Sequence, residues 1–285
     1  MVNIIIWVLV AGLYSPIISQ LYKARWEAID YTHAYFILPV FILFLLFKRK
    51  QLKNSVTASL IPADGRNELG SCHRIKYTVT GIIILIVGLL MFILGWKWDY
   101  LMITTGSLIP VLFGLVLYLY GPATAKIMAF PILYLLLMVP PPLGILDSIT
   151  MPMRYGISIA TEHILKIFSV PITRDGLMLI VGGHEVYMGA PCSGFRSLIT
   201  MLSLGLAYVY FINARLRNKV ILVASVVPLA LLGNLIRVTG MCLVTYKFGE
   251  ETGHKFHDTS GLVIFVVLIL GLLGIESLLE KKPKK

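Results

Sequence analysis

The sequence is poor in charged residues: Asp, Glu, Lys and Arg make up 14% of its 285 residues, whereas hydrophobic residues make up 58%. About a quarter of the residues in a soluble globular domain are charged. The composition therefore excludes an ordinary soluble domain and indicates an integral membrane protein. The net charge of +11 does not indicate nucleic-acid binding, because the basic residues lie at the ends of apolar segments and not on one polar face. No nucleic acid is expected as a partner.

Cysteine is scarce as well. The three cysteines, Cys72, Cys192 and Cys242, include no CxxC pair, and their odd number argues against a disulfide framework. No zinc site is predicted, because the histidines lack i, i+4 spacing on one helix and have no accompanying carboxylate. No cofactor site is predicted either. Cys72 lies in a polar loop and is interpreted as an ordinary reduced thiol.

Long apolar stretches dominate the chain, and a membrane-spanning helix needs about 20 apolar residues. Eight stretches approach this length: 3–20, 33–47, 77–96, 100–120, 125–140, 195–213, 220–243 and 260–279. The second and fifth are short and contain or end in proline. The first has no small-x-small cleavage motif, so we expect it to be retained. The predicted fold is an all-α polytopic membrane protein with about eight transmembrane helices, forming a single integral-membrane domain over residues 1–285.

Lysine and arginine gather on one side of this predicted bundle. They are frequent in loop 48–76, in loop 214–219 and after residue 280, whereas the opposite loops carry few. Because cytoplasmic loops are enriched in Lys and Arg, both termini are predicted to be cytoplasmic and Cys192 to face outward. Aromatic residues in loops 26–33 and 96–100 are more typical of anchoring at the membrane interface than of substrate contact.

A small extracytoplasmic cap is predicted at about 141–191. Apolar residues at helical spacing over 145–169 indicate a helix that lies in the membrane interface. Two β-prone runs, 176–181 and 184–188, flank a Gly-Gly pair, which is typical of a β-hairpin. The cap would thus consist of one interfacial helix and one hairpin, immediately before Cys192.

Cys192 is the candidate nucleophile. It is followed by Ser193 and Gly194 at the start of an apolar stretch, and the positive end of a helix favours the thiolate form of a cysteine. Arg196, one turn further on, would add positive potential, and Gly194 would let a substrate backbone approach closely. The alternative is a small, buried, inert cysteine.

Arg237 is the candidate cation. About 26 Å of helix separates residues 220 and 237, so Arg237 is predicted to lie near the outer boundary of its span. A buried arginine in an apolar stretch indicates a functional site facing the bundle interior, and the alternative is an arginine that reaches to lipid phosphates. Asn234, on the same helix face, is a second polar group that needs a partner.

His257 is the candidate proton carrier, predicted at the outer mouth of the last helix, where Asp258, Thr259 or Ser260 could act as N-cap. His254 is its competitor. The charge pattern brings a thiol, a proton carrier and a fixed cation from three helices to the outer membrane surface. These groups are the parts that acyl transfer needs.

At these residues the sequence resembles the exosortase/archaeosortase family. The resemblance rests on three motifs: PCSGFR at 191–196, NLIRV at 234–238 and HDTSG at 257–261, the last of which includes Gly261. Phe195 departs from the family pattern, because an aliphatic residue is expected there more often. The loop that ends at His33 also resembles the family. The histidine at 257 is similar to the bacterial exosortase branch.

The resemblance implies a cysteine transpeptidase or protease of the cell inner membrane that acts on secreted proteins with a C-terminal sorting signal of the PEP-CTERM kind: a short motif, a transmembrane helix and a basic tail. It implies that Cys192 attacks the scissile carbonyl, that Arg237 stabilises the oxyanion and that His257 is the general acid and base. Partners would be the signal peptide, membrane lipid and a lipid or glycan acceptor, and the enzyme would be associated with exopolysaccharide. Alternatives are a hydrolytic protease, a small-solute transporter, or a membrane acyltransferase or glycan ligase.

Overall fold

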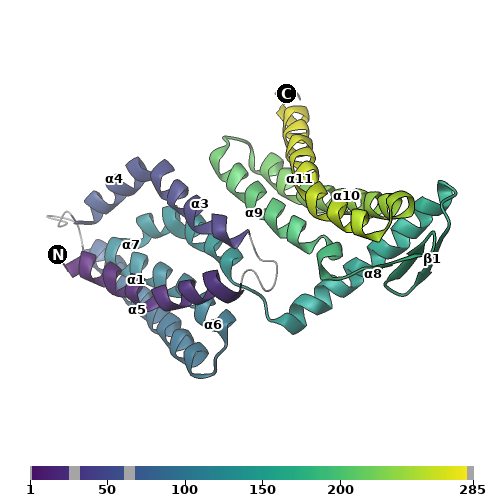
Figure 1. Cartoon of the computed structure of the whole chain (residues 1–285). Coiled ribbons are helices and arrows are strands. Elements are labelled where there is room, and N and C mark those ends of the chain that lie inside the picture. The colour runs from purple at the N-terminus through teal and green to yellow at the C-terminus, as the bar shows by residue number, and fades with distance from the viewer. Residues whose placement is uncertain (1, 26–32, 61–67, 281–285) are drawn as a thin grey trace. The chain divides into compact units, whose positions relative to one another are not determined.

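The computed structural model describes residues 2–25, 33–60 and 68–280. Within these ranges the chain is helical apart from a small three-stranded sheet (Figure 1). The chain divides into two compact units, Met1–Pro142 and Leu143–Lys285. The single-domain organisation over residues 1–285 stays a prediction.

The first unit is a group of helices joined by short connections: α1 (Val2–Gln20), η1 (Leu21–Arg25), α3 (Ala34–Phe47), α4 (Arg49–Leu60), α5 (Glu68–Lys97), α6 (Leu101–Gly106), α7 (Leu108–Tyr134) and η2 (Leu135–Met138). Helices α5 and α7 pack so closely that small residues are required between them. A Cβ placed on Gly114 would lie 2.6 Å from the backbone nitrogen of Leu85, and one on Gly81 would lie 2.8 Å from that of Tyr118. Glycine at such contacts lets helix backbones approach, as in membrane helix pairs.

The second unit contains the residues of the candidate site. Its elements are α8 (Leu143–Ile167), β1 (Ile172–Asp175), β2 (Met178–Val181), β3 (His184–Tyr187), η3 (Ala190–Ser193), α9 (Phe195–Phe211), α10 (Leu216–Phe248) and α11 (Glu250–Glu280). Helix α10 packs against α9 and α11 (Figure 1). An apolar cluster joins α8, the sheet, η3 and α10, and it includes Ile157, Leu179, Cys192 and Cys242.

The sheet confirms the predicted hairpin and adds one strand to it. Strands β2 and β3 pair antiparallel with Val181 opposite His184, and the Gly182-Gly183 turn between them has φ angles of 59° and 88°. Positive φ at both central residues is the reason why a Gly-Gly pair suits a two-residue hairpin turn. Strand β1 pairs with the other edge of β2, and the sequence did not predict it.

Helix α8 matches the predicted cap helix in extent, and its apolar and charged residues are distributed as follows. Ile145, Ile149 and Ile167 are exposed, whereas Arg154 is only 6% exposed. The sequence analysis gave no role to Arg154, whose buried charge is taken up with the site below. The location of α8 in a membrane interface stays a prediction.

Five helical segments of the described chain are long and apolar enough to cross a membrane: Asn3–Lys23, Lys76–Lys97, Leu101–Met138, Leu216–Phe248 and Thr259–Leu279. Ala34–Phe47 and Phe195–Phe211 are shorter apolar helices. The predicted spans 100–120 and 125–140 both fall almost entirely within the segment Leu101–Met138, and the backbone leaves the helical conformation between them, at Gly121, with φ 77° and ψ −178°. The all-α polytopic membrane fold is thus confirmed.

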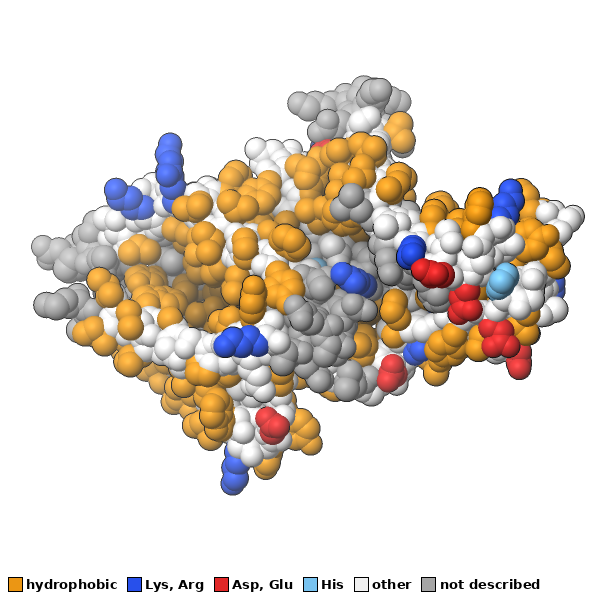
Figure 2. Space-filling model, in the orientation of Figure 1, with side chains coloured by type: hydrophobic (Ala, Val, Ile, Leu, Met, Phe, Trp, Pro, Cys, Tyr) orange, Lys and Arg blue, Asp and Glu red, His pale blue; other side chains and the backbone are white. Residues whose placement is uncertain are grey.

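The outer surfaces of these helices are apolar, as lipid contact requires. On α1, Ile4, Val8 and Leu9 are 68%, 63% and 66% exposed. Figure 2 shows hydrophobic side chains spread over much of the visible face, with lysine and arginine in scattered positions. Apolar surface this extensive is rare on a soluble monomer, and it fits helices whose backbone groups are satisfied internally within a bilayer.

Candidate active site

Cys192 lies in the short 3-10 helix η3, and Gly194 separates it from α9, which begins at Phe195. The hydroxyl of Ser193 donates a hydrogen bond to the carbonyl oxygen of Ala190 at 2.8 Å and accepts one from the backbone N–H of Phe195 at 3.2 Å. Ser193 thus fixes the turn and satisfies one free N–H at the start of α9. Cys192 is 7% exposed. It precedes the helix and does not belong to its first turn.

Asn234 and Arg237 of α10 hold the backbone of this turn. The side-chain amide of Asn234 donates to the carbonyl oxygen of Cys192 at 2.8 Å. Nη2 of Arg237 donates to the carbonyl oxygen of Pro191 at 2.9 Å and to Oδ1 of Asn234 at 3.1 Å. The buried amide, 2% exposed, therefore has the partners that the sequence argument required. Arg237 is directed at the cysteine segment, which argues against an arginine that reaches to lipid.

Two features require glycine at position 194: its backbone conformation and the close approach of a neighbouring side chain. It adopts a left-handed conformation with φ 75° and ψ 1°, which costs other L-residues about 1–2 kcal/mol. A Cβ there would also lie 2.7 Å from Cγ of Asn234. The sequence assigned Gly194 to close approach of a substrate. In the structure the close approach is made by Asn234.

His257 and Asp258 lie inside α11, so the predicted N-cap at Asp258, Thr259 or Ser260 is wrong. The helix begins at Glu250, directly after Gly249, whose φ of 86° ends α10. Glu250 and Glu251 in the first turn favour a helix start there, because acidic side chains stabilise the positive end of a helix. A start at Glu250 leaves residues 257–260 within the helix.

The face of α11 that carries Gly261 lies against Arg237. A Cβ on Gly261 would be 3.8 Å from Nη1 of Arg237. His257 precedes Gly261 by one turn and His254 by about two, which corresponds to about 6 Å and about 10 Å along the helix. Along the helix axis His257 is therefore nearer than His254 to Gly261 and Arg237. The side chains of His254, His257 and Asp258 lie outside the described residues, so the position of the imidazole stays a prediction.

The electrostatic setting of the thiol differs from the expectation of a helix-activated cysteine. Burial raises the pKa of Cys192 above its ordinary value, and the positive charge of Arg237, a backbone hydrogen bond from Gly189 and the positive charge of Arg154 act in the opposite direction. Arg196, predicted to act on this thiol, is exposed. The groups that favour the thiolate are therefore two guanidinium groups and a backbone hydrogen bond.

Arg154 is the residue of this region that sequence reasoning missed. A usable signal was present: polar residues recur at positions 150, 154, 158 and 161, which is helical spacing. All four of these side chains are buried. Among the described residues, no group of three or more His, Cys, Asp or Glu side chains could hold a metal ion.

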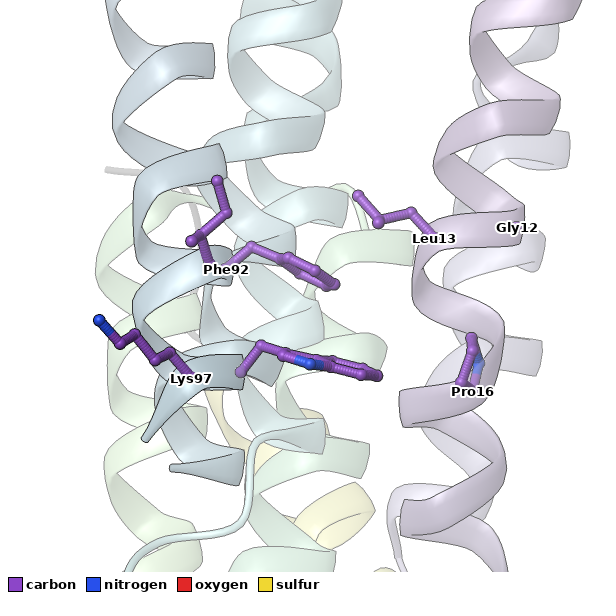
Figure 3. A pocket seen from close by; sticks show the side chains of 7 residues that line it. Gly12, Leu13, Pro16, Phe92 and Lys97 are labelled. Atoms are coloured by element: carbon purple, nitrogen blue, oxygen red, sulfur yellow. The ribbon is translucent and has the colours of Figure 1, made fainter. Parts of the chain in front are cut away.

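A cavity of about 450 Å³ lies elsewhere, in the first unit, between α1 and the end of α5 (Figure 3). Its lining is almost entirely apolar: Gly12, Leu13, Pro16, Phe92, Ile93, Trp96 and Lys97. Lys97 supplies its single charged group. None of the candidate catalytic residues lines this cavity, and its lining contains no nucleophile paired with a base.

Comparison with known protein families assigns the chain. The family model described as transmembrane exosortase matches residues 26–274. The chain belongs to the transmembrane exosortase family. The match spans all of the residues singled out above, from Cys192 to Gly261. No curated protein and no solved structure matches the chain.

Membership of the exosortase family establishes the general class of activity. The exosortases are cysteine-type membrane peptidases and transpeptidases that act on proteins bearing sorting signals. The apolar helices of the structure fit a multi-pass membrane protein of this family. The contacts among Pro191, Cys192, Asn234 and Arg237 bring together two of the three motifs on which the resemblance rested.

Proposed function

We propose that the protein is a membrane cysteine transpeptidase in which Cys192 is the nucleophile, Arg237 stabilises the oxyanion and His257 is the general acid and base. Its substrates are secreted proteins whose C-terminal sorting signal consists of a short motif, a transmembrane helix and a basic tail. The acceptor is an amine on a lipid or a cell-surface glycan. The contact of Arg237 and Asn234 with the Pro191–Cys192 backbone is the observation that carries this proposal.

In the first half-reaction the thiolate sulfur of Cys192 attacks the scissile carbonyl carbon and forms a tetrahedral oxyanion. The guanidinium of Arg237 lies beside the cysteine backbone and carries donors that can hold this oxygen. His257 gives a proton to the leaving amine nitrogen, the C–N bond breaks, and the signal helix and tail depart. The substrate is then held as a thioester on Cys192.

In the second half-reaction the acceptor amine attacks the thioester carbonyl while His257 takes its proton. The C–S bond breaks and the thiolate of Cys192 is restored, so that protons and electrons balance over the cycle. Water in place of the amine would give a free carboxylate, which makes hydrolysis the same chemistry with a different acceptor. Soluble sortases have similar chemistry on an unrelated fold, which is convergence of the site alone.

The proposed topology has both termini in the cytoplasm and the site at the outer face of the cell inner membrane. It is supported by the excess of lysine and arginine in loops 48–76 and 214–219. Helix α10 has 33 residues and is predicted to run from the cytoplasmic side to the outer side. Arg237 lies in its second half. A site at this level can meet a peptide bond that lies just outside the bilayer, beyond the signal helix.

The test is processing of a tagged substrate that carries a motif, an apolar helix and a basic tail, in membranes that contain the full-length protein. Cys192→Ala and Cys192→Ser are expected to abolish processing while membrane insertion remains normal. Cys72→Ala, which removes a thiol predicted to be cytoplasmic, is the matched control and is expected to process normally. If the Cys192→Ala variant still processes the substrate, Cys192 is not the nucleophile. A product that ends in a free carboxylate would identify water as the acceptor.

A further inference from the structure

One face of α8 carries a row of buried polar side chains. Thr150, Arg154, Ser158 and Thr161 are 3%, 6%, 0% and 0% exposed, and their spacing of three to four residues places them on the same side of the helix. Ile157 is also buried, and it belongs to the same apolar cluster as Cys192. Helix α8 packs against η3, the element that contains Cys192. The buried face of α8 is therefore turned toward the cysteine segment.

The guanidinium of Arg154 is weakly neutralised by its own surroundings. Its Nη2 lies 3.5 Å from the hydroxyl of Thr150 and 3.7 Å from a carboxylate oxygen of Asp147, whose side chain is 70% exposed. Its Nε is buried and has no hydrogen-bond partner among the described residues. A guanidinium carries five N–H donors, and contacts of this length satisfy few of them. A buried charge in this condition is unfavourable unless an anion joins it.

We propose that Arg154 is a second cationic residue of the active site, which acts from α8 together with Arg237 from α10 to stabilise the anionic form of Cys192. The two arginines have different tasks. Nη2 of Arg237 is bound to the carbonyl oxygen of Pro191 and to Asn234, so Arg237 shapes the turn and is near the scissile carbonyl. Arg154 supplies positive potential at the sulfur of Cys192. It acts on the reaction only through that sulfur, so it is a positioning residue and not a catalytic one.

The charged and titratable groups around the sulfur include both arginines, and the charge of Arg237 has the larger effect on the thiol. Burial raises the pKa of Cys192, whereas the positive charges of Arg237 and Arg154 lower it. From α8, Asp147 faces Arg154 and reduces its effect. From α10, Cys242 belongs to the same cluster. The inference rests on the proposed function only in taking Cys192 as the reacting thiol.

The experiment measures the rate of iodoacetamide alkylation at Cys192 against pH in the purified full-length protein, resolved from the other cysteines by peptide mass spectrometry. Arg154→Gln is expected to raise the pH midpoint by about one pH unit, which is about tenfold less thiolate below the midpoint. Arg154→Lys keeps the charge and is expected to stay close to the wild-type midpoint. Lys166→Gln removes one exposed charge from the same helix, about 18 Å from Arg154, and is expected to leave the midpoint unchanged.

A wild-type midpoint in Arg154→Gln would overturn the proposal. Equal shifts in Arg154→Gln and Arg154→Lys would also overturn it, because they would indicate lost packing and not lost charge. Asp147→Asn provides a test on an exposed residue that does not threaten folding, should Arg154→Gln fail to insert. It removes the negative charge beside Arg154 and is expected to lower the midpoint, and an unchanged or raised midpoint would contradict the proposal.

Processing of the tagged substrate gives a second readout. Arg154→Gln is expected to process slowly at neutral pH and to recover as the pH rises toward its new midpoint, which a purely structural defect would not do. Different results would contradict the proposed function and the role of Arg154. Processing by Cys192→Ala would refute the proposed function, whereas a pH-independent defect in Arg154→Gln would refute the role of Arg154 alone.

Discussion

Replacing Gly194 by alanine is expected to disable the site while the protein still inserts into the membrane. Two effects combine. The residue has a φ of 75°, and holding alanine in a left-handed conformation costs about 1–2 kcal/mol. The new Cβ would also lie 2.7 Å from Cγ and 2.8 Å from Cβ and Nδ2 of Asn234. Such distances force the Asn234 side chain or the Cys192 turn to move.

The displacement has a cost that can be worked from the contacts of Asn234. Its amide donates to the carbonyl oxygen of Cys192, and its Oδ1 accepts from Arg237. A buried group that loses a hydrogen-bond partner costs about 1–3 kcal/mol. If about 2 kcal/mol of this cost falls on the transition state, the rate of processing falls about 30-fold.

Gly183→Ala is the matched control for this substitution. Gly183 also has a positive φ, 88°, but a Cβ there would meet no atom within 4 Å. Both variants therefore carry the left-handed cost, and only Gly194→Ala carries the clash with Asn234. Initial rates of substrate processing, with thermal unfolding in detergent followed in parallel, separate the two effects. A Gly194→Ala rate equal to that of Gly183→Ala would refute the reasoning.

Three further predictions concern the catalytic residues. Arg237→Lys is expected to lower processing at least tenfold, because an ammonium lacks the planar fork that bonds two oxygens at once; near-normal rates would contradict its role. His257→Ala is expected to be more damaging than His254→Ala, since His257 is nearer to Arg237 along α11, and the reverse order of rates would exchange their assignments. Because burial raises the pKa of Cys192 and the thiolate is the reactive form, kcat/KM should still rise above pH 7; a profile already flat at pH 7 would indicate a preformed thiolate.

The apolar helices were predictable from the sequence because their lengths are set by membrane thickness, and the hairpin was predictable because its Gly182-Gly183 turn has a distinct chemistry. Strand β1 was not predictable in this way. It has four residues, Ile172–Asp175, and it alternates between buried and partly or fully exposed positions only because it pairs with β2. A strand this short and polar depends on its neighbour more than on its own residues.

In the site, the charge pattern of the loops predicted that Cys192, Arg237 and His257 lie at the same level, and Asn234 was expected to need a partner because it is a buried polar group. The structure brings Cys192, Asn234 and Arg237 together, and the position of the imidazole of His257 stays a prediction. The sequence did not decide whether the thiol of Cys192 is buried, because burial is a tertiary effect. It gave no role to Arg154. The burial of Arg154 follows from the packing of α8 on η3, which periodicity within one helix cannot reveal.

The central claim is that Cys192 carries the acyl group of the substrate. Its most direct test is to quench the full-length protein during turnover of the tagged substrate and to identify the adduct by peptide mass spectrometry. We expect a thioester between Cys192 and the residue on the N-terminal side of the cleaved bond, released by hydroxylamine and absent in Cys192→Ala. Turnover with no adduct on Cys192, or with an adduct on another residue, would contradict the account.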